Sequence, residues 1–258
     1  MRLEISDLEV RFGERRVVAV SDLAIGEAEI VGLAGESGSG KSMTTLAILG
    51  LAQTVGATVN GSIRLDGTEL TSLSADAMRQ VRGRRIAAIF QSPSSSFNPV
   101  FRVGATVLRA LRLHGLSKTE AAERAETAMR AVLLRPELLR RYPAQLSGGQ
   151  LQRVAIALAL ALRAEVLLAD EPTSALDVTV QAEVLDLLRH LRASEGMSIL
   201  FISHDLAVVA ELCDHVAVMH SGRIIEQGPS SQVLAAPQDP YTADLIAAVP
   251  KIKTGAGR

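Results

Sequence analysis

The stretch EIVGLAGESGSGKSMTTLAILGL, residues 29–51, decides the fold. Glu29–Ala34 is an apolar run that predicts a buried strand, and Lys41–Leu51 has the composition of a helix. Between them the residues follow the spacing G-x4-G-K-S. Glycines let the backbone turn so that its amide groups point at phosphate oxygens, and the following helix directs its positive end to the same place. The stretch therefore predicts a site for a nucleoside triphosphate, because strand, loop and helix come in the required order.

Each side chain of this phosphate loop has an expected task. The Lys41 ammonium neutralises charge on the β- and γ-phosphates, and the Ser42 hydroxyl is a ligand of Mg²⁺. The residues expected to contact the nucleotide are Gly35, Ser37, Gly38, Ser39, Gly40, Lys41 and Ser42.

Two adjacent acids follow a second apolar run. Val166–Ala169 predicts a short buried strand, with Asp170 and Glu171 at its carboxyl end, where ligands bind in open α/β sheets. Asp170 is expected to hold Mg²⁺, and Glu171 to polarise the water that attacks the γ-phosphate. The alternative is a solvated acidic turn.

The pentapeptide Leu146-Ser-Gly-Gly-Gln150 precedes a helix predicted at 149–162. The Ser147 hydroxyl and the amides of Gly148 and Gly149 offer an uncharged phosphate cradle at that helix start. One subunit cannot fold this cradle onto its own phosphate loop.

Strands and helices alternate along most of the chain, which predicts an α/β fold with a mostly parallel sheet covered on both faces. A serine- and proline-rich loop, 92–101, opens a helical block at 92–148, and Ser117 to Glu120 forms a capping box within it. Strands are expected at 3–10, 17–23, 63–65, 86–90, 166–169, 198–202 and 215–219, and helices at 103–134, 178–192 and 205–212.

Bulk composition excludes several classes of protein. The 258 residues are 48% hydrophobic and 21% charged with a net charge of −1, so nothing suggests a nucleic-acid-binding protein. The longest apolar run, Val154–Leu162, is nine residues, whereas a membrane span needs about 20. The N-terminus reads as a strand and not as a secretion signal. The single cysteine, Cys213, permits no intrachain disulfide and is expected to be buried. We expect a cytoplasmic protein whose membrane role comes through partners.

The order of these motifs resembles the nucleotide-binding subunit of ABC transporters over nearly the whole chain. The resemblance implies a RecA-like, mostly parallel core sheet with an N-terminal antiparallel part and a helical subdomain. It also implies that Phe12 stacks on adenine and that Gln91 is the Q-loop glutamine, a catalytic residue and metal ligand. His204 matches the catalytic switch histidine, and Asp177 ends the D-loop, Ser174–Asp177.

The resemblance also implies an assembly. Two subunits would pair head to tail around two ATP molecules, with Ser147, Gly148, Gly149 and Gln150 of each closing over the ATP of the other. The second subunit is either a homologue or another copy of this chain. Two transmembrane permeases and, indirectly, an extracytoplasmic substrate-binding protein would complete the assembly. This chain would lie at the cytoplasmic face of the membrane. The chain is then a single domain: 1–91 and 149–235 as catalytic core, 92–148 as helical subdomain and 236–258 as tail.

Two segments indicate a narrower group. Phe90–Pro99, FQSPSSSFNP, is similar to a segment of peptide and nickel importer ATPases, and so is the tail Ala236–Thr242 followed by Leu245 and Pro250. Asp239 stands where that group often has histidine. Residues 92–103 would help form the groove that receives a permease. The alternative is that they form an ordinary surface loop. The cargo stays open between peptide, nickel and other metal chelates.

A DNA-repair, chromosome or translation-type ABC ATPase is the competing class. Such proteins carry long coiled coils or a second cassette. Here about 100 residues without sustained heptads separate the two phosphate-binding motifs, and there is one cassette.

Overall fold

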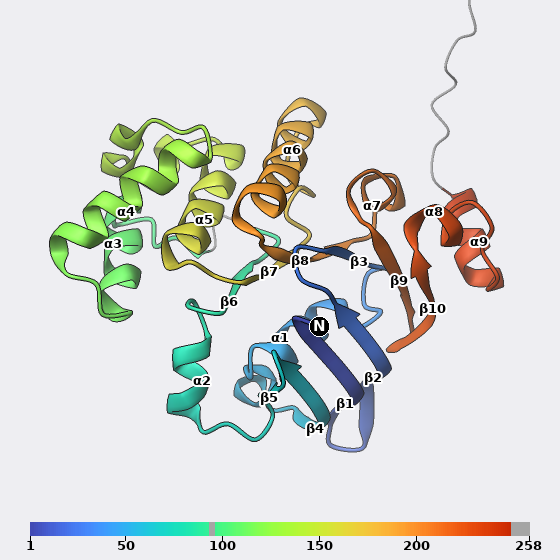
Figure 1. Cartoon of the computed structure of the whole chain (residues 1–258). Coiled ribbons are helices and arrows are strands. Elements are labelled where there is room, and N and C mark those ends of the chain that lie inside the picture. Colours follow the sequence, from blue (N-terminus) through green and yellow to red (C-terminus); the bar gives the residue numbers. More distant parts are fainter. Residues whose placement is uncertain (93–95, 249–258) are drawn as a thin grey trace, which may run out of the picture.

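Two β-sheets organise the protein (Figure 1). The computed structural model describes residues 1–92 and 96–248. The first sheet is antiparallel and has the order β2-β1-β4-β5. Its strands are β1 (Leu3–Phe12), β2 (Arg15–Ile25), β4 (Thr58–Leu65) and β5 (Thr68–Glu69).

The second sheet has the order β10-β9-β3-β8-β7-β6 and is parallel except for β10. Every residue of β3, β7 and β8 is buried, because both faces of this sheet are covered. These observations confirm the predicted α/β fold with an N-terminal antiparallel part. The strands are β3 (Ile30–Ala34), β6 (Ile86–Ile89), β7 (Val166–Asp170), β8 (Ser198–Ser203), β9 (His215–His220) and β10 (Arg223–Pro229).

Helices cover both faces of the second sheet (Figure 1). Helix α1 lies between the two sheets, and α5, α6 and α7 lie on the other side. The α-helices are α1 (Lys41–Ile48), α2 (Ala75–Val81), α3 (Val103–Leu113), α4 (Lys118–Ala131), α5 (Gly148–Leu162), α6 (Val178–Glu195), α7 (Leu206–Leu212), α8 (Ser230–Val233) and α9 (Pro240–Ala247). Short 3-10 helices are η1 (Ala52–Val55), η3 (Pro136–Arg140) and η4 (Pro143–Gln145).

The second sheet separates two hydrophobic cores. Side chains alternate across a strand, so in β3 Val31 and Leu33 face the antiparallel sheet and α1, while Ile30 and Ala34 face the helices. The core on the helical side continues without interruption into α3 and α4. The division of the chain at 92 and 148 therefore stays a prediction.

Several predicted elements were wrong in extent. The segment 103–134, expected to be helical with a capping box at Ser117, forms two helices, α3 and α4; the capping box starts α4 as predicted, and the break before it, where Gly115 adopts a φ of 90°, was not placed. The helix expected to reach residue 51 ends at Ile48, and Gly50 has a φ of 62°. The strand expected at 63–65 begins at Thr58.

Among the strands and α-helices of the described residues, β5, α2, β10, α8 and α9 were missed, while the predicted burial of Cys213 was confirmed. Asp66 and Gly67 form the turn between β4 and β5, and Cys213 is buried at the end of α7. Residues 93–95 of the 92–101 loop, and 249–258 with Pro250, lie outside the described residues.

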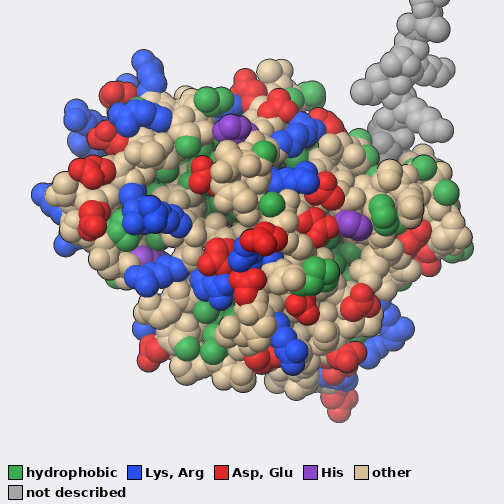
Figure 2. Space-filling model, viewed as in Figure 1, with side chains coloured by type: hydrophobic (Ala, Val, Ile, Leu, Met, Phe, Trp, Pro, Cys, Tyr) green, Lys and Arg blue, Asp and Glu red, His purple; other side chains and the backbone are tan. Residues whose placement is uncertain are grey.

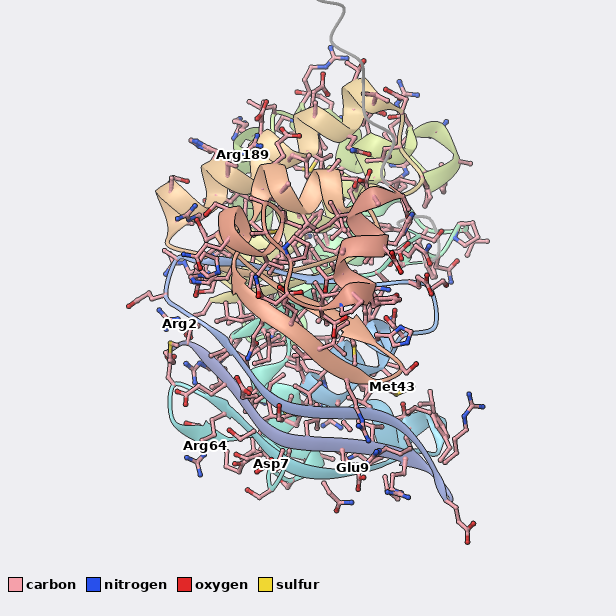
Figure 3. All side chains as sticks on the ribbon, turned by 90° about the vertical axis from the view of Figure 1, so that its right-hand side faces the viewer. Arg2, Asp7, Glu9, Met43, Arg64 and Arg189 are labelled. Atoms are coloured by element: carbon pink, nitrogen blue, oxygen red, sulfur yellow. The ribbon has the colours of Figure 1, made fainter. Side chains whose placement is uncertain are left out.

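A network of ion pairs joins the two sheets at the amino ends of the parallel strands. Arg2 Nη1 lies 2.8 Å from Asp66 and 3.4 Å from Glu165, and Arg85 Nη2 lies 2.5 Å and 2.7 Å from the same carboxylates. In Figure 3, Arg2 lies on the opposite side of the view from Met43, which belongs to the first turn of α1, directly after the loop that follows β3. The network therefore fastens the two sheets away from the loop that follows β3.

The surface in Figure 2 mixes basic and acidic side chains, in keeping with the net charge of −1. Within the described part of the chain, no helix is long and apolar enough to cross a membrane.

Candidate functional site

The phosphate loop connects β3 to α1, and its glycines are required by a positive φ and, at Gly35 and Gly40, also by close neighbours. Gly35 has a φ of 150°, and a Cβ there would lie 2.1 Å from the backbone oxygen of Met219. Gly40 has a φ of 111°, and its Cβ would lie 3.0 Å from the backbone oxygen of Val17. Gly38 has a φ of 81° with nothing within 4 Å of its Cβ position. The loop is packed from below by β9 and β2 and presents bare backbone to the open side, which suits an anion.

Lys41 curls back over this loop. Its Nζ donates to the backbone oxygens of Gly35 and Glu36, both at 2.7 Å. Only 5% of the residue is exposed. Burial lowers the pKa of Lys41, although three nearby carboxylates oppose that effect. The Lys41 ammonium is thus bound by two backbone carbonyl groups of the loop that is expected to bind the phosphates.

Asp170 ends β7 beneath the loop and is only 4% exposed. Burial raises the pKa of its carboxyl group, and a hydrogen bond with Ser42 opposes the rise. Its Oδ1 is buried without a hydrogen-bond partner among the described residues. Buried carboxylate oxygens are normally paired, so an orphaned one beside the Ser42 hydroxyl fits a hard divalent cation. Among the described residues, no cluster of three or more His, Cys, Asp or Glu side chains could hold a metal by itself.

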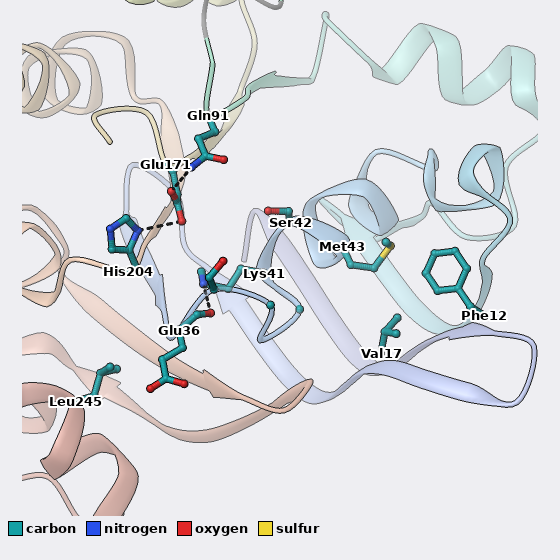
Figure 4. A pocket seen from close by; sticks show the side chains of 13 residues that line it. Phe12, Val17, Glu36, Lys41, Ser42, Met43, Gln91, Glu171, His204 and Leu245 are labelled. Carbon is teal, nitrogen blue, oxygen red and sulfur yellow. Dashed lines mark hydrogen bonds and ion pairs between the residues drawn. The ribbon is translucent and has the colours of Figure 1, made fainter. Parts of the chain in front are cut away.

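Three side chains meet above the loop (Figure 4). Gln91 Nε2 donates to Oε2 of Glu171 at 2.7 Å, and Nδ1 of His204 lies 3.1 Å from Oε1 of the same carboxylate. They follow β6, β7 and β8, which are neighbours in the sheet, so their carboxyl ends coincide. Glu171 has a φ of 47°, which turns the chain sharply at the strand end. Both carboxylate oxygens of Glu171 are therefore engaged.

A cavity of about 610 Å³ contains most of the predicted site. It is elongated: Phe12, Val17 and Met43 lie at one end, and Glu171 and His204 at the other (Figure 4). The predicted residues that line it are Phe12, Ser37, Gly38, Gly40, Lys41, Ser42, Gln91, Glu171 and His204. Gly35, Ser39 and Asp170 are buried and do not line it.

Sequence reasoning missed Val17, Glu36, Met43 and Leu245 in the cavity wall. Val17 comes from β2 and Leu245 from α9, far from the loop in sequence. No local pattern distinguishes an apolar residue that lines a cavity from one in the core.

Ser147, Gly148, Gly149, Gln150 and Asp177 do not line this cavity. Ser147 Oγ accepts from the N–H of Gln150 at 3.2 Å, and Gln150 Oε1 accepts from the N–H of Ser147 at 3.0 Å, which caps α5. Asp177 caps α6 by accepting from a backbone N–H at 3.0 Å. Within one chain, the pentapeptide therefore lies outside the cavity that the phosphate loop lines.

Comparison with known proteins gives concordant results. A family model described as "ABC transporter" matches residues 19–174. A Brucella abortus protein named for peptide import is 43% identical over 258 residues, which cover 97% of this chain and 77% of that protein. A dipeptide transport ATP-binding protein of Haemophilus influenzae is 40% identical, covering 99% of this chain and 80% of the relative.

Two solved structures share the fold. The cbiO1 protein of Clostridium perfringens, part of the transporter complex cbiONQ, has a TM-score of 0.80 and 27% identity over 91% of this chain and 90% of its own. A dimeric ATP-binding cassette in a post-hydrolysis state, bound to ADP and Pi, has a TM-score of 0.75 and 27% identity, covering 88% of this chain and 98% of its own.

Proposed function

This chain belongs to the ABC transporter family of ATPases, and on that premise we propose that it powers the import of peptides across a membrane. The observation that carries the catalytic part is the meeting of Gln91, Glu171 and His204 at the end of the phosphate-loop cavity. The peptide cargo is supported by the names of the relatives. A nickel or other metal chelate is the alternative cargo, since no residue assigned a role here would contact the cargo.

The residues of the site suggest how hydrolysis begins. ATP lies with its adenine against Phe12 and its phosphates on the loop, and Lys41 leaves the carbonyls of Gly35 and Glu36 for the β- and γ-phosphates. His204 turns from Glu171 to donate to the γ-phosphate. A freed carboxylate oxygen then accepts a proton from the water that attacks phosphorus, and ADP leaves.

Mg²⁺ fits the group formed by Ser42, Gln91 and the unpartnered oxygen of Asp170. When bound, it neutralises charge that develops on the phosphate oxygens. Asp170 would contribute a buried carboxylate to hold the ion, and the amide oxygen of Gln91 would be the second ligand beside the Ser42 hydroxyl.

A second subunit supplies the missing side of the nucleotide. Ser147, Gly148, Gly149 and Gln150 of a homologue or a second copy close over the γ-phosphate, with Asp177 at the seam. ATP then holds the dimer together, and hydrolysis releases it. The separation of this pentapeptide from the cavity within one chain, and the dimeric state of a similar cassette, support this arrangement.

The ATPase docks on two transmembrane permeases at the cytoplasmic face of the membrane, and an extracytoplasmic substrate-binding protein brings the cargo to the other side of the permeases. Segment 92–103 contributes to the docking groove. In its described part the adjacent apolar residues Val100 and Phe101 are 69% and 52% exposed, which leaves them available for contact with a partner. The helical block 92–148 moves with Gln91 when the γ-phosphate is lost.

The substitution Glu171→Gln tests the catalytic proposal. It keeps the shape and the bonds to Gln91 and His204 but removes the proton acceptor, so phosphate release is expected to fall by at least about 100-fold. ATP binding persists and the ATP-bound dimer accumulates in size-exclusion chromatography. Glu195→Gln, on an exposed residue at the end of α6, is the matched control and retains wild-type turnover. Hydrolysis by Glu171→Gln at the wild-type rate would refute the assignment.

A pull-down from native membranes with ATP and vanadate tests the transport role. Two permeases and a second ABC ATPase are expected in the mass spectrum, and the ligand of the associated binding protein then identifies the cargo. Recovery of DNA- or ribosome-associated partners without a permease would contradict the importer proposal.

A further inference from the structure

The C-terminal helix α9 reaches the phosphate loop. The hydroxyl of Tyr241, in the first turn of α9, accepts a hydrogen bond from the backbone N–H of Glu36 at 3.4 Å. Leu245, one turn later, lines the cavity beside Glu36, at the end that also holds His204 (Figure 4). The residue Tyr241 of this helix, 205 residues away from Glu36 in sequence, thus contacts the start of the loop.

Tyr241 is held in place independently of this hydrogen bond. Its ring packs on His220 at the end of β9, with ring centroids 4.0 Å apart. Asp239 caps α9 by accepting from the N–H of Tyr241 at 2.8 Å, and Glu226 of β10 accepts from the N–H of Asp239 at 3.1 Å. The ring and the helix therefore remain anchored when the hydroxyl alone is removed.

The same β-strand end supports the loop directly. Gly222, after β9, donates its N–H to the backbone oxygen of Ser39 at 2.9 Å, and Gly35 packs against the backbone oxygen of Met219. These contacts hold the middle and the base of the loop. The N–H of Glu36, between them, is held by Tyr241.

The peptide group between Gly35 and Glu36 links Tyr241 to the lysine. Its N–H, that of Glu36, donates to Tyr241, and its carbonyl oxygen, that of Gly35, accepts from Lys41 Nζ at 2.7 Å. The orientation of this one peptide group thus decides both where the carbonyl holds the ammonium and how the start of the loop is set.

We propose that Tyr241 is a positioning residue of the nucleotide site, which holds the peptide group between Gly35 and Glu36, and through it Lys41, in the arrangement that receives ATP. Helix α9 is then part of the ATP site. It raises the affinity for ATP through Tyr241, although Tyr241 does not itself contact the nucleotide. This inference rests on the proposed role of the phosphate loop.

Tyr241→Phe tests the proposal in the full-length chain. The change removes the hydroxyl and keeps the ring on His220. One hydrogen bond of about 1 kcal/mol corresponds to about a fivefold change in a binding constant. We expect the Kd and the KM for ATP to rise about fivefold with kcat unchanged, because the preorganisation of the loop is lost but Glu171 and His204 stay in place. The chain has one other tyrosine, so Tyr142→Phe makes the same chemical change away from the cavity and serves as the control.

Thermal unfolding without nucleotide separates positioning from a structural role. An unchanged Tm for Tyr241→Phe, together with the raised KM, supports the proposal. A KM within twofold of wild type overturns it, and so does a rise in KM that accompanies a large fall in Tm and in kcat. Failure of the wild-type chain to bind ATP would refute the role of the loop itself, whereas normal wild-type binding with an indifferent Tyr241→Phe would refute only this inference.

Discussion

At two adjacent glycines at the start of α5, the same substitution is expected to have opposite effects on stability. A Cβ on Gly148 would meet Leu176 Cδ2 at 3.4 Å, an ordinary contact with the end of a flexible side chain. A Cβ on Gly149 would lie 2.3 Å from Val180 Cγ1, on α6. Carbon atoms pack favourably at about 3.5–4.0 Å, so the second methyl group would overlap Val180 by more than about 1 Å.

The magnitudes follow from this difference. Neither glycine has a positive φ, so alanine at either position gains about 0.5–1 kcal/mol of helix stability. At Gly149 the overlap costs about 1–3 kcal/mol, because a valine in a helix has essentially one rotamer available. We therefore expect Gly148→Ala to be neutral or stabilising and Gly149→Ala to be less stable than it by about 2 kcal/mol. That difference corresponds to roughly 4–8 °C in Tm for a domain of this size.

Urea and thermal unfolding of the nucleotide-free protein, followed by circular dichroism, measure the difference; the chain has no tryptophan for fluorescence. The double variant Gly149→Ala/Val180→Ala removes the opposing methyl groups, and its stability is expected to recover by about 1–2 kcal/mol more than additivity allows. Equal stability of the two alanine variants, or a double variant that is simply additive, would show that α5 and α6 do not touch as described.

Two further predictions concern pH. Burial raises the folded-state pKa of Asp170 above its usual 3.8, so the ionised carboxylate costs stability at neutral pH. Asp170→Asn is expected to raise the Tm of the nucleotide-free protein at pH 7, with a gain that vanishes below pH 3.8, while phosphate release from ATP is lost; a lower Tm at pH 7 would contradict this. For Glu69, burial opposes ionisation, but hydrogen bonds from two hydroxyl groups and two backbone N–H groups outweigh it and lower the pKa from 4.5 to about 2. The ionised Glu69 carboxylate therefore stabilises the folded state above pH 4.5, and this contribution is lost as pH falls towards 2. Glu69→Gln should have a lower Tm than wild type at pH 7 but not at pH 2. A difference in Tm that does not depend on pH would refute the assignment.

Local physics explains what could be read from the chain and what was misread. Strands β3, β7 and β8 are unbroken apolar runs, and helices α4 and α5 begin at capping boxes, so these elements were predicted close to their bounds. Within the helical segment 103–134, the capping box marked the start of α4, whereas the end of α3 before Gly115, which has a φ of 90°, was not predicted. Strand β10 was missed because none of its residues is fully buried, so it lacks a strong hydrophobic pattern.

The strand–loop–helix of the phosphate site could be predicted from the residues alone, since glycine spacing and helix direction act over a few residues. The α/β class and the acid pair at a strand end could be predicted in the same way. The contacts of Gln91 and His204 with Glu171 depend on the three-dimensional fold, since sheet order brings three strand ends together. The fold alone placed Val17 and Met43 beside Phe12, and Tyr241 on Glu36. These contacts join segments far apart in the chain, and only the packing of the sheets and α9 sets their distances.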